Sequence, residues 1–392
     1  MAQAYIAGAV RTAGGKKKGR LSGVHPADLG GKVLDGLVAR TGVEAAKVED
    51  VIFGCVSQNG EQAGNVARTC VLSSSYPESV PGTTVDRQCG SGQQAIHFAV
   101  QAVMSGTQDL VVAGGVESMT RVPIGSNIID GLKNGHGHPW NGEAVVARYP
   151  GVQFSQFTGA EMLAKKHELS REQLDEFAHR SHTRAARAIE EGRFAREILP
   201  LDVKLEDGTE VTHEVDEGVR PDADLEKMKG LDPLSEGGLL TAATSSQICD
   251  GAAAVLIANE RGLKDNNLIP RARFHTLTVV GDDPVIMLEG PIPATQKALA
   301  KAGMKIEDFD VYEVNEAFAP VPLSWAKVIG ADEEKLNVNG GAIALGHPLG
   351  ATGAKLMTSL LHELERIDGR WGLLAICEGG GTANCTIIER LS

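Results

Sequence analysis

The sequence predicts an α/β protein whose early and late parts show the same order of strands and helices and are separated by a region of different character. Short β-rich runs alternate with helical segments, which is typical of parallel sheets covered by helices on both faces. The same order of runs occurs again in the later part of the chain, and a polar region of different composition lies between the two. The chain has 392 residues, too many for one simple core, so a duplicated or multi-domain structure is expected.

The first half is expected to occupy residues 1–118. Its β-rich runs are AYIAGAV (4–10), DVIFGCV (50–56), TTVDRQ (83–88) and DLVVAGG (109–115). Helices are predicted over Pro26–Arg40 and Gln93–Ser105. The apolar run Gly251–Ala258 indicates a buried strand, so residues 249–268 are expected to return to this half.

The second half, residues 269–392, repeats this order. Its β-rich runs are RARFHTLTVV (271–280), DVYEVNE (310–316), LNVNG (336–340) and GLLAICEGGG (372–381), with helices predicted over Thr295–Ala302 and Thr352–Arg366. Cys89 follows the third run of the first half, and His347 follows the corresponding run of the second. Because α/β proteins place their sites at the ends of parallel strands, these two residues are candidates for one site.

The intervening segment, residues 119–248, is expected to form a loop-rich cap over the site. Its beginning, TRVPIGSNIIDGLKNGHGHPWNGE (120–143), is rich in Gly, Pro and Asn. A polar helix is predicted over Gly159–Glu191, with Ser170 as a helix cap within it and Gly192 at its end. The stretch LPLDVKLEDGTEVTHEVDEG (199–218) predicts a hairpin that turns at Asp207–Gly208.

Composition and charge exclude several classes of function. The formal net charge of −13 argues against a general nucleic-acid binder, which needs a basic face. No apolar run approaches the ~20 residues that cross a bilayer. The beginning of the chain, AYIAGAVRT, is typical of a buried strand rather than a signal peptide. We therefore expect a cytoplasmic enzyme that has neither nucleic acid nor membrane among its partners.

The cysteine pattern argues against a metal site. The 6 cysteines contain no CxxC pair, and Cys377 and Cys385 lack the neighbouring histidines of a zinc site. No metal is therefore expected. Reduced thiols fit a cytosolic protein best.

Cys89, in DRQCGSGQQAI (86–96), is the predicted nucleophile. It follows a predicted strand and precedes a predicted helix, and a helix amino terminus lowers the pKa of a thiol below its ordinary value of about 8.5. The following Gly90, Ser91 and Gly92 allow backbone amides to point at a reacting carbonyl, as in an oxyanion hole. A buried cysteine more often serves only packing. The strand–turn–helix context favours the catalytic interpretation.

His347 and Cys377 complete a chemical set with Cys89. His347 lies in NVNGGAIALGHPLGATG (337–353), where residues too small to fill a core indicate a main chain that approaches a ligand closely. Cys377 begins CEGGGTANCTI (377–387), and its Gly tail distinguishes it from Cys385. Cys55, Cys70, Cys249 and Cys385 are interpreted as structural. A nucleophilic cysteine, a histidine and a second thiol are the components of acyl transfer through a thioester.

With these motifs, the chain resembles the thiolases, the acyl-CoA C-acyltransferases, over essentially its whole length. Four motifs occur in the family's order: the nucleophile motif around Cys89, NEAFA at Asn315–Ala319, GGAIALGHPLGATGA at Gly340–Ala354, and CEGGG at Cys377–Gly381. The resemblance implies a duplicated αβαβα layered sandwich with an inserted loop domain. It also implies acyl-CoA and coenzyme A as substrates, no permanently bound cofactor, and a homodimer or homotetramer.

The resemblance further implies a role for each site residue. The amides of Cys89 and Gly379 would form the oxyanion hole, and His347 would take the thiol proton of Cys89. Cys377 would move the proton at the α-carbon. Asn315 would hold a water that, together with His347, binds the oxygen of the developing enolate.

Substrate contacts are expected from several further residues. By resemblance, Ser246 and Ala242, in TAATSS, would contact the pantetheine. Among the basic residues of the cap, Arg220 is expected to contact the coenzyme A phosphates, and Phe318 is expected to contact the substrate. Two pairs of residues fall at acyl-pocket positions. Short-chain biosynthetic thiolases carry His-Met where this chain has Gln156 and Phe157, and they carry Gly-Thr where it has Leu288 and Glu289 after Met287. These departures favour thiolytic cleavage of a 3-oxoacyl-CoA longer than four carbons, in fatty-acid or steroid-type chain degradation.

Other functions fit parts of the sequence. A short-chain acetyl-CoA acetyltransferase that forms acetoacetyl-CoA is the nearest alternative. A β-ketoacyl synthase has a similar fold and nucleophile but needs no second catalytic thiol, and an inactive binding protein does not account for the retention of Cys89, Asn315, His347 and Cys377. A dinucleotide-binding oxidoreductase would use Gly90–Ala95 as G-x-G-x-x-G/A. Its acidic residue should close a second strand about 20 residues on, whereas Asp109 precedes the run LVVAGG.

Overall fold

The structure, a computed structural model that describes residues 2–391, is built around one mixed ten-stranded sheet. The first half contributes β1 (Tyr5–Arg11), β2 (Gly15–Lys16), β3 (Asp50–Gly54), β4 (Gly82–Val85), β5 (Leu110–Ser118) and β8 (Cys249–Ala258). The second half contributes β9 (Ala272–Gly281), β10 (Val311–Val314), β11 (Trp371–Glu378) and β12 (Thr382–Arg390).

The strand order reveals the duplication. It runs β10-β11-β12-β9-β1-β8-β5-β3-β4, with β2 paired to β8. The two halves join where β1 pairs with β9, at Tyr5 with Arg273 and Ile6 with Ala272. Read outward from this junction, β1-β8-β5-β3 of the first half corresponds to β9-β12-β11-β10 of the second.

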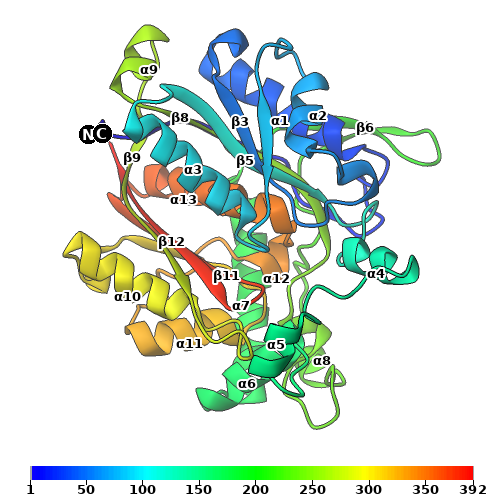
Figure 1. The fold of residues 1–392 in the computed structure, drawn as a ribbon. Helices are drawn as coiled ribbons and strands as arrows, with labels where there is room; N and C mark the ends of the chain where they lie inside the picture. Colours follow the sequence, from blue (N-terminus) through cyan, green and yellow to red (C-terminus); the bar gives the residue numbers. More distant parts are fainter. Residues whose placement is uncertain (1, 392) are drawn as a thin grey trace.

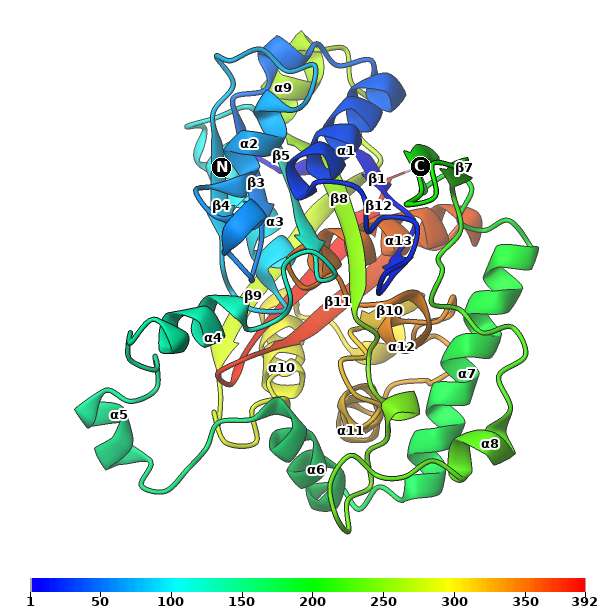
Figure 2. The ribbon, with the colours of Figure 1, turned by 90° about the vertical axis from the view of Figure 1, so that its right-hand side faces the viewer.

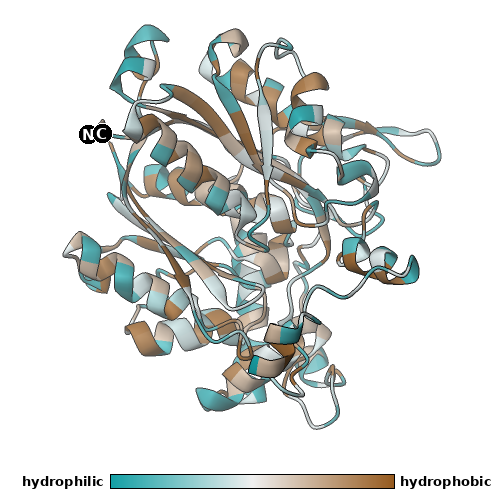
Figure 3. Ribbon diagram, in the orientation of Figure 1, coloured by the Kyte–Doolittle hydropathy of each residue, from teal (hydrophilic) through white to brown (hydrophobic). Residues whose placement is uncertain are grey.

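Helices cover the two half-sheets in the layer order αβαβα (Figure 1). The outer layers are α1 (Pro26–Thr41) and α2 (Val66–Leu72) on one side, and α10 (Pro291–Ala302) and α11 (Pro320–Ile329) on the other. The central layer is α3 (Ser91–Ser105) with α13 (Thr352–Arg366). Their apolar side chains, including Ile96 and Met357, are buried together with strand residues of both halves, such as Val255 and Leu374. Figure 3 shows the apolar colouring along the strands and the inward-facing helices. The predicted layered α/β fold is confirmed.

The remaining helices and the small hairpin lie mostly in the inserted segment (Figure 2). They are α4 (Ser126–Lys133), α5 (Glu143–Arg148), α6 (Gln156–Lys166), α7 (Arg171–Glu190), β6 (Leu201–Lys204), β7 (Glu210–His213) and α8 (Leu225–Lys229). Two short helices, α9 (Glu260–Asp265) and α12 (Ala342–Leu345), lie outside it. The predicted hairpin is confirmed, because β6 and β7 pair antiparallel around Asp207–Gly208. The chain divisions at residues 118, 248 and 268 stay predictions.

The prediction of purely parallel sheets was wrong. Pairing is parallel between β3 and its neighbours β4 and β5, and between β10 and β11. The strand β8 pairs antiparallel with β1 and β5, and β12 pairs antiparallel with β11 and β9. The strand β12 was not predicted. Because the short turn Gly379–Gly381 joins β11 directly to β12, those strands must run in opposite directions.

Two predicted elements differ in detail. The run at Leu336–Val338 forms no strand, only one bridge from Leu336 to Tyr312. The amide side chain of Asn337 takes over the pairing, since it accepts from the Val314 N–H and donates to the Val314 carbonyl, both at 2.9 Å. The helix predicted over Gly159–Glu191 is divided into α6 and α7. Ser170 caps the second of these through a complete capping box with Gln173.

Candidate active site

Cys89 lies in the tight turn between β4 and α3. The preceding residue, Gln88, has a positive φ of 48°, a backbone conformation that needs support from its surroundings. The Ser91 hydroxyl supplies it: it accepts from the Arg87 N–H at 2.8 Å and donates to the Gln88 carbonyl at 2.6 Å. Ser91 therefore holds the turn that presents Cys89. This role of Ser91 was not predicted from the sequence, although a serine at the start of a helix often bonds to nearby backbone groups.

The pKa of the Cys89 thiol is raised to about 12, which contradicts the lowering predicted from the helix terminus. Burial is the main cause, and the Glu378 carboxyl contributes next. Both effects disfavour a thiolate and outweigh the partial positive charge at the start of α3. At neutral pH, Cys89 is therefore a neutral thiol.

His347 is held in one tautomer by Thr352. The His347 Nδ1 lies 2.6 Å from the Thr352 hydroxyl oxygen, and that hydroxyl donates its only proton to the Pro348 carbonyl at 3.0 Å. Nδ1 must therefore carry the hydrogen, which leaves a lone pair on Nε2. Burial, together with the charge of Lys355, lowers the pKa of His347 to about 3, so the imidazole is neutral. Thr352 was not identified from the sequence, because only the folded loop places it against His347.

Asn315 lies directly beside the histidine. Its Nδ2 is 3.3 Å from the His347 Nε2, and the side chain is 1% exposed. Within residues 2–391, its Oδ1 has no hydrogen-bond partner. A buried acceptor without a partner is rare, and an ordered water is one common way of satisfying it.

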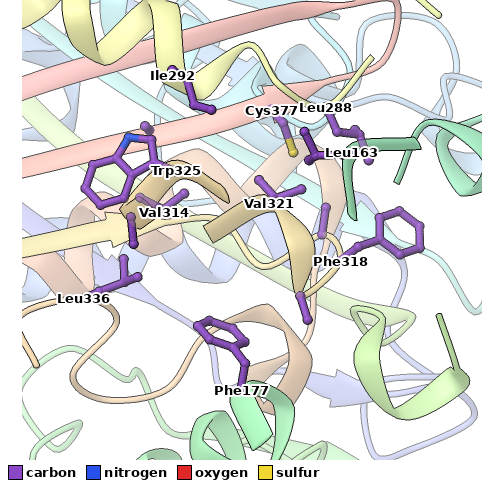
Figure 4. Close-up of a cluster of buried hydrophobic side chains, with 14 of the residues drawn as sticks. Leu163, Phe177, Leu288, Ile292, Val314, Phe318, Val321, Trp325, Leu336 and Cys377 are labelled. Carbon is purple, nitrogen blue, oxygen red and sulfur yellow. The ribbon is translucent and has the colours of Figure 1, made fainter. Parts of the chain in front are cut away.

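Cys377 lies among buried apolar side chains near the end of β11. Figure 4 shows its sulfur near Leu163 and Leu288. Burial raises the pKa of Cys377 well above its ordinary value, and Cys89 and Glu378 add to the effect. The second thiol is therefore also neutral. Gly379 follows Glu378 and lies against the residue before the nucleophile, since a methyl group on Gly379 would lie 3.0 Å from Gln88 Oε1.

Cys89 and Gly379 open on a common cavity of about 760 Å³. Gln156 and Met287 also line it, so the structure brings these two predicted acyl-pocket residues to the nucleophile. Much of the remaining lining is apolar and comes from separate parts of the chain: Val56, Ile124, Trp140, Phe154 and Leu349.

The other acyl-pocket positions lie elsewhere. Phe157 is 49% exposed, packs edge-on against Phe318 at 5.4 Å, and lines a separate cavity of about 550 Å³. Leu288 is part of the core packed around α10 and α11. Glu289 forms an ion pair with Lys166 at 2.5 Å and a hydrogen bond with His167 at 2.8 Å.

Two of the predicted coenzyme A contacts, Ala242 and Ser246, lie on one segment. The Ser246 N–H donates to the Ala317 carbonyl at 3.0 Å, beside the buried Phe318. One residue further, the Gln247 carbonyl accepts from the His347 N–H at 3.1 Å. The segment from Ala242 to Gln247 therefore runs between the NEAFA motif and the histidine loop. Arg220 is exposed. Two residues before it, the Gly218 carbonyl accepts from the Gln247 side-chain amide at 2.9 Å.

Among residues 2–391, no helix is long and apolar enough to span a membrane. The same residues contain no cluster of three or more His, Cys, Asp or Glu side chains arranged to hold a metal ion.

Comparison with known proteins identifies the family. The model of the thiolase N-terminal domain matches residues 4–261, and that of the thiolase C-terminal domain matches residues 268–390. A steroid 3-ketoacyl-CoA thiolase of Mycobacterium tuberculosis is 56% identical over 392 residues, covering 100% of this chain and 95% of that protein. A 3-ketoacyl-CoA thiolase of Pseudoalteromonas translucida is 42% identical, covering 98% of each chain.

The fold comparison agrees. The crystal structure of an acetyl-CoA acetyltransferase from Bacillus anthracis has a TM-score of 0.91 and 39% identity, covering 100% of this chain and 99% of that one. The duplicated fold and the family models define an acyltransferase of α/β architecture. The chain belongs to the thiolase family and to its degradative type, which confirms the identification from the sequence motifs.

Proposed function

We propose that this enzyme cleaves 3-oxoacyl-CoA with coenzyme A, through an acyl-enzyme on Cys89, to give acetyl-CoA and a shortened acyl-CoA. The observation that carries the proposal is the shared cavity, in which the predicted nucleophile and the glycine of the predicted oxyanion hole meet a mostly apolar lining. The names of the relatives at 56% and 42% identity support the same reaction.

The first half-reaction breaks the carbon–carbon bond. His347 Nε2 takes the Cys89 thiol proton as the sulfur attacks the 3-oxo carbon, and the amides of Cys89 and Gly379 stabilise the resulting oxyanion. Collapse of this intermediate breaks the bond between C2 and C3 and leaves an acyl thioester on Cys89. The electron pair of that bond forms the acetyl-CoA enolate. The Cys377 thiol protonates it at C2, while His347 and a water held by Asn315 bind its oxygen.

The second half-reaction regenerates the enzyme. The thiol of coenzyme A gives its proton to the Cys377 thiolate left by the first half-reaction and attacks the acyl thioester on Cys89. Collapse of this second intermediate breaks the bond to the Cys89 sulfur and releases the shortened acyl-CoA, and the His347 imidazolium returns its proton to that sulfur. Because the Cys89 thiol and the His347 imidazole are both neutral in the structure, proton transfer should accompany attack rather than precede it.

The acyl group is proposed to be longer than four carbons and to occupy the shared cavity. A cavity of about 760 Å³ leaves room for a long acyl chain. Trp140 and Phe154, whose rings pack against each other with centroids 4.7 Å apart, contribute apolar surface to its lining. The second candidate is the short-chain acetyl-CoA acetyltransferase reaction. The structural similarity to the Bacillus anthracis acetyl-CoA acetyltransferase favours it.

The first prediction tests the acyl carrier. Incubated with an acyl-CoA and no acceptor, the enzyme should gain one acyl mass on the peptide containing Cys89, measured by mass spectrometry, with ping-pong kinetics. Thiolysis rates with 3-oxoacyl-CoA of four, eight and sixteen carbons, and with one polycyclic acyl-CoA, would define the substrate range. A rate that is highest for four carbons would favour the second candidate.

Two variants provide the controls. Cys89→Ala should not acylate. Cys377→Ser should still acylate Cys89 but fail at thiolysis, because a hydroxyl is far less acidic than a thiol and is a poor proton donor to the carbanion. Acylation that persists in Cys89→Ala would refute the assignment.

We also propose that the enzyme is cytoplasmic and forms a homodimer or homotetramer. Within each chain, the proposed divisions between the first half, the inserted segment and the second half fall at residues 118, 248 and 268. All six cysteines are free thiols, which fits a reducing compartment. The strand β4 lies at the edge of the sheet, where its unpaired backbone groups can bind a second copy.

A further inference from the structure

Glu378 is a buried carboxyl that the reaction described above does not use. It lies between Cys377 and Gly379 on β11 and is 0% exposed. Its Oε2 accepts from the Thr382 hydroxyl at 2.6 Å. Within the described residues, its Oε1 has no hydrogen-bond partner.

The partnerless oxygen is directed at the turn that carries the nucleophile. A methyl group built on Gly90 would overlap Glu378 Oε1, so the carboxyl occupies the space above this glycine. Only glycine allows that approach. The carboxyl of Glu378 is therefore packed against the residue that follows Cys89, and its charge acts on both Cys89 and Cys377.

We propose that Glu378 is a positioning residue of the acyl-transfer site, that its carboxyl must be uncharged while Cys89 takes and releases the acyl group, and that its ionisation limits the reaction at alkaline pH. This inference rests on the proposed function. A neutral carboxyl packs against the turn without electrostatic cost. A carboxylate there would oppose the negative charge that develops first on sulfur and then on the carbonyl oxygen.

The charges around Glu378 agree with this role. Burial raises the pKa of Glu378 to about 8, against lowering by Thr382 and by Arg87. Arg87, from the loop before α3, is the cation whose charge acts on Glu378, and among residues 2–391 its Nε has no hydrogen-bond partner. A charge on Glu378 raises the pKa of two thiols, that of Cys89 in the same loop as Arg87 and that of Cys377, the preceding residue on β11. From β12, the Thr382 hydroxyl donates to Glu378. Glu117 and Asp86 raise the pKa of Cys89 as well, by less than Glu378 does.

The test measures the reactivity of Cys89 without turnover. Wild type and Glu378→Gln are alkylated with iodoacetamide between pH 6 and pH 10, and the rate for the Cys89 peptide is followed by mass spectrometry. Near pH 6, the two rates should be similar, because both side chains are neutral. Above pH 8, the variant should react about tenfold faster, which corresponds to one unit in the pKa of Cys89. Its thiolysis activity should also persist to higher pH than that of wild type.

A second variant tests the proposal if Glu378→Gln does not fold. Thr382→Val removes the hydrogen bond that stabilises the carboxylate, so Glu378 should ionise at higher pH and Cys89 should react faster near pH 8 to 9. Thr278→Val on β9 is the matched control, since this buried hydroxyl bonds only the Ala294 carbonyl. A rate ratio that is constant from pH 6 to pH 10 would overturn the proposal. Failure to acylate Cys89 with acyl-CoA would instead count against the proposed function.

Discussion

At the scale of single residues, protonation is governed by burial more than by local sequence. Cys89 begins a helix, yet its pKa is raised, because the surrounding protein removes water and places Glu378 nearby. His347 is neutral for the same reason. Its usefulness as a base then depends on which nitrogen holds the lone pair, and Thr352 decides this.

Thr352→Val should therefore impair catalysis while preserving the fold. Without the hydroxyl, Nδ1–H of His347 has no acceptor and the imidazole is no longer held in one tautomer. We expect kcat to fall about 10- to 100-fold, with little change in Tm. Thr352→Ser should restore most of the activity.

Thr358→Val is the matched control for this prediction. Thr358 lies on the same helix and is equally buried, but its hydroxyl bonds only the Ala354 carbonyl at 2.8 Å. If both variants lose activity to the same degree, the effect belongs to the helix and not to the tautomer of His347.

At the scale of secondary-structure elements, the turn between β11 and β12 positions part of the site. It carries Gly379 and connects two strands whose pairing begins where Trp371 lies opposite Glu389 and ends where Glu378 lies opposite Thr382. Gly381 has a φ of +73°, and its carbonyl accepts from the Asp282 N–H at 2.6 Å. The turn is therefore anchored to the segment after β9, and its shape sets the direction of the Gly379 amide.

Gly381→Ala should distort this turn. Alanine is disfavoured at a positive φ, and its Cβ would lie 2.7 Å from Pro284 Cα and 2.8 Å from the Asp282 carbonyl oxygen. We expect a loss of about 1–3 kcal/mol in stability, measured by thermal denaturation, and a lower rate of Cys89 acylation.

Gly281→Ala is a close control, because Gly281 pairs with Thr382 across the strands and has open space around its Cα. It should leave both Tm and the acylation rate nearly unchanged. A Gly381→Ala enzyme that acylates normally would separate the turn from the oxyanion hole.

At the scale of the whole molecule, a buried ion cluster joins the first half, the inserted segment and the histidine loop. Arg11 on β1 contacts Glu197 at 2.5 Å and Asp216 at 2.9 and 3.0 Å. Lys355 lies 3.8 Å from Asp216 and donates to the Leu345 carbonyl at 2.5 Å. Burial alone would raise the pKa of Asp216, but Arg11 and Lys355 lower it below its ordinary value.

Arg11→Met should destabilise the protein most at neutral pH. Because the pKa of Asp216 is lower in the folded than in the unfolded chain, its carboxylate stabilises the fold at pH 7, and this contribution is lost as the pH falls through the folded pKa. Without Arg11, two buried carboxylates lack their partner, which costs about 3–5 kcal/mol. At pH 5, protonation of these groups should reduce the deficit in Tm.

Arg261→Met serves as the control. Arg261 also pairs with a carboxylate, Asp109, at 2.5 Å, but its side chain is 64% exposed. Exposed pairs contribute little, so its Tm should change little and show no such pH dependence. An Arg11→Met deficit that is equal at pH 5 and pH 7 would contradict the electrostatic explanation.

The sequence by itself determined the features that depend on neighbouring residues. The bounds Thr352–Arg366 of α13 were predicted correctly from apolar periodicity, and the motifs around Cys89, Asn315, His347 and Cys377 were enough to identify the family. The repeated order of runs predicted the layered fold, because each run carries its own periodicity. Pairing direction was misjudged at two strands. The strand β12 had not been recognised, and its short turn makes it antiparallel to β11, while β8 was recognised but pairs antiparallel with β1 and β5.

Only the tertiary structure decided the chemical state of the site. The pKa values of Cys89, His347 and Glu378 depend on burial and on charges contributed by other parts of the fold. The same is true of the cavity, to which Gln156 and Met287 contribute but the neighbouring Phe157 and Leu288 do not. Desolvation and Coulomb interactions act through space, between residues that the chain separates widely, so no local pattern in the sequence encodes them.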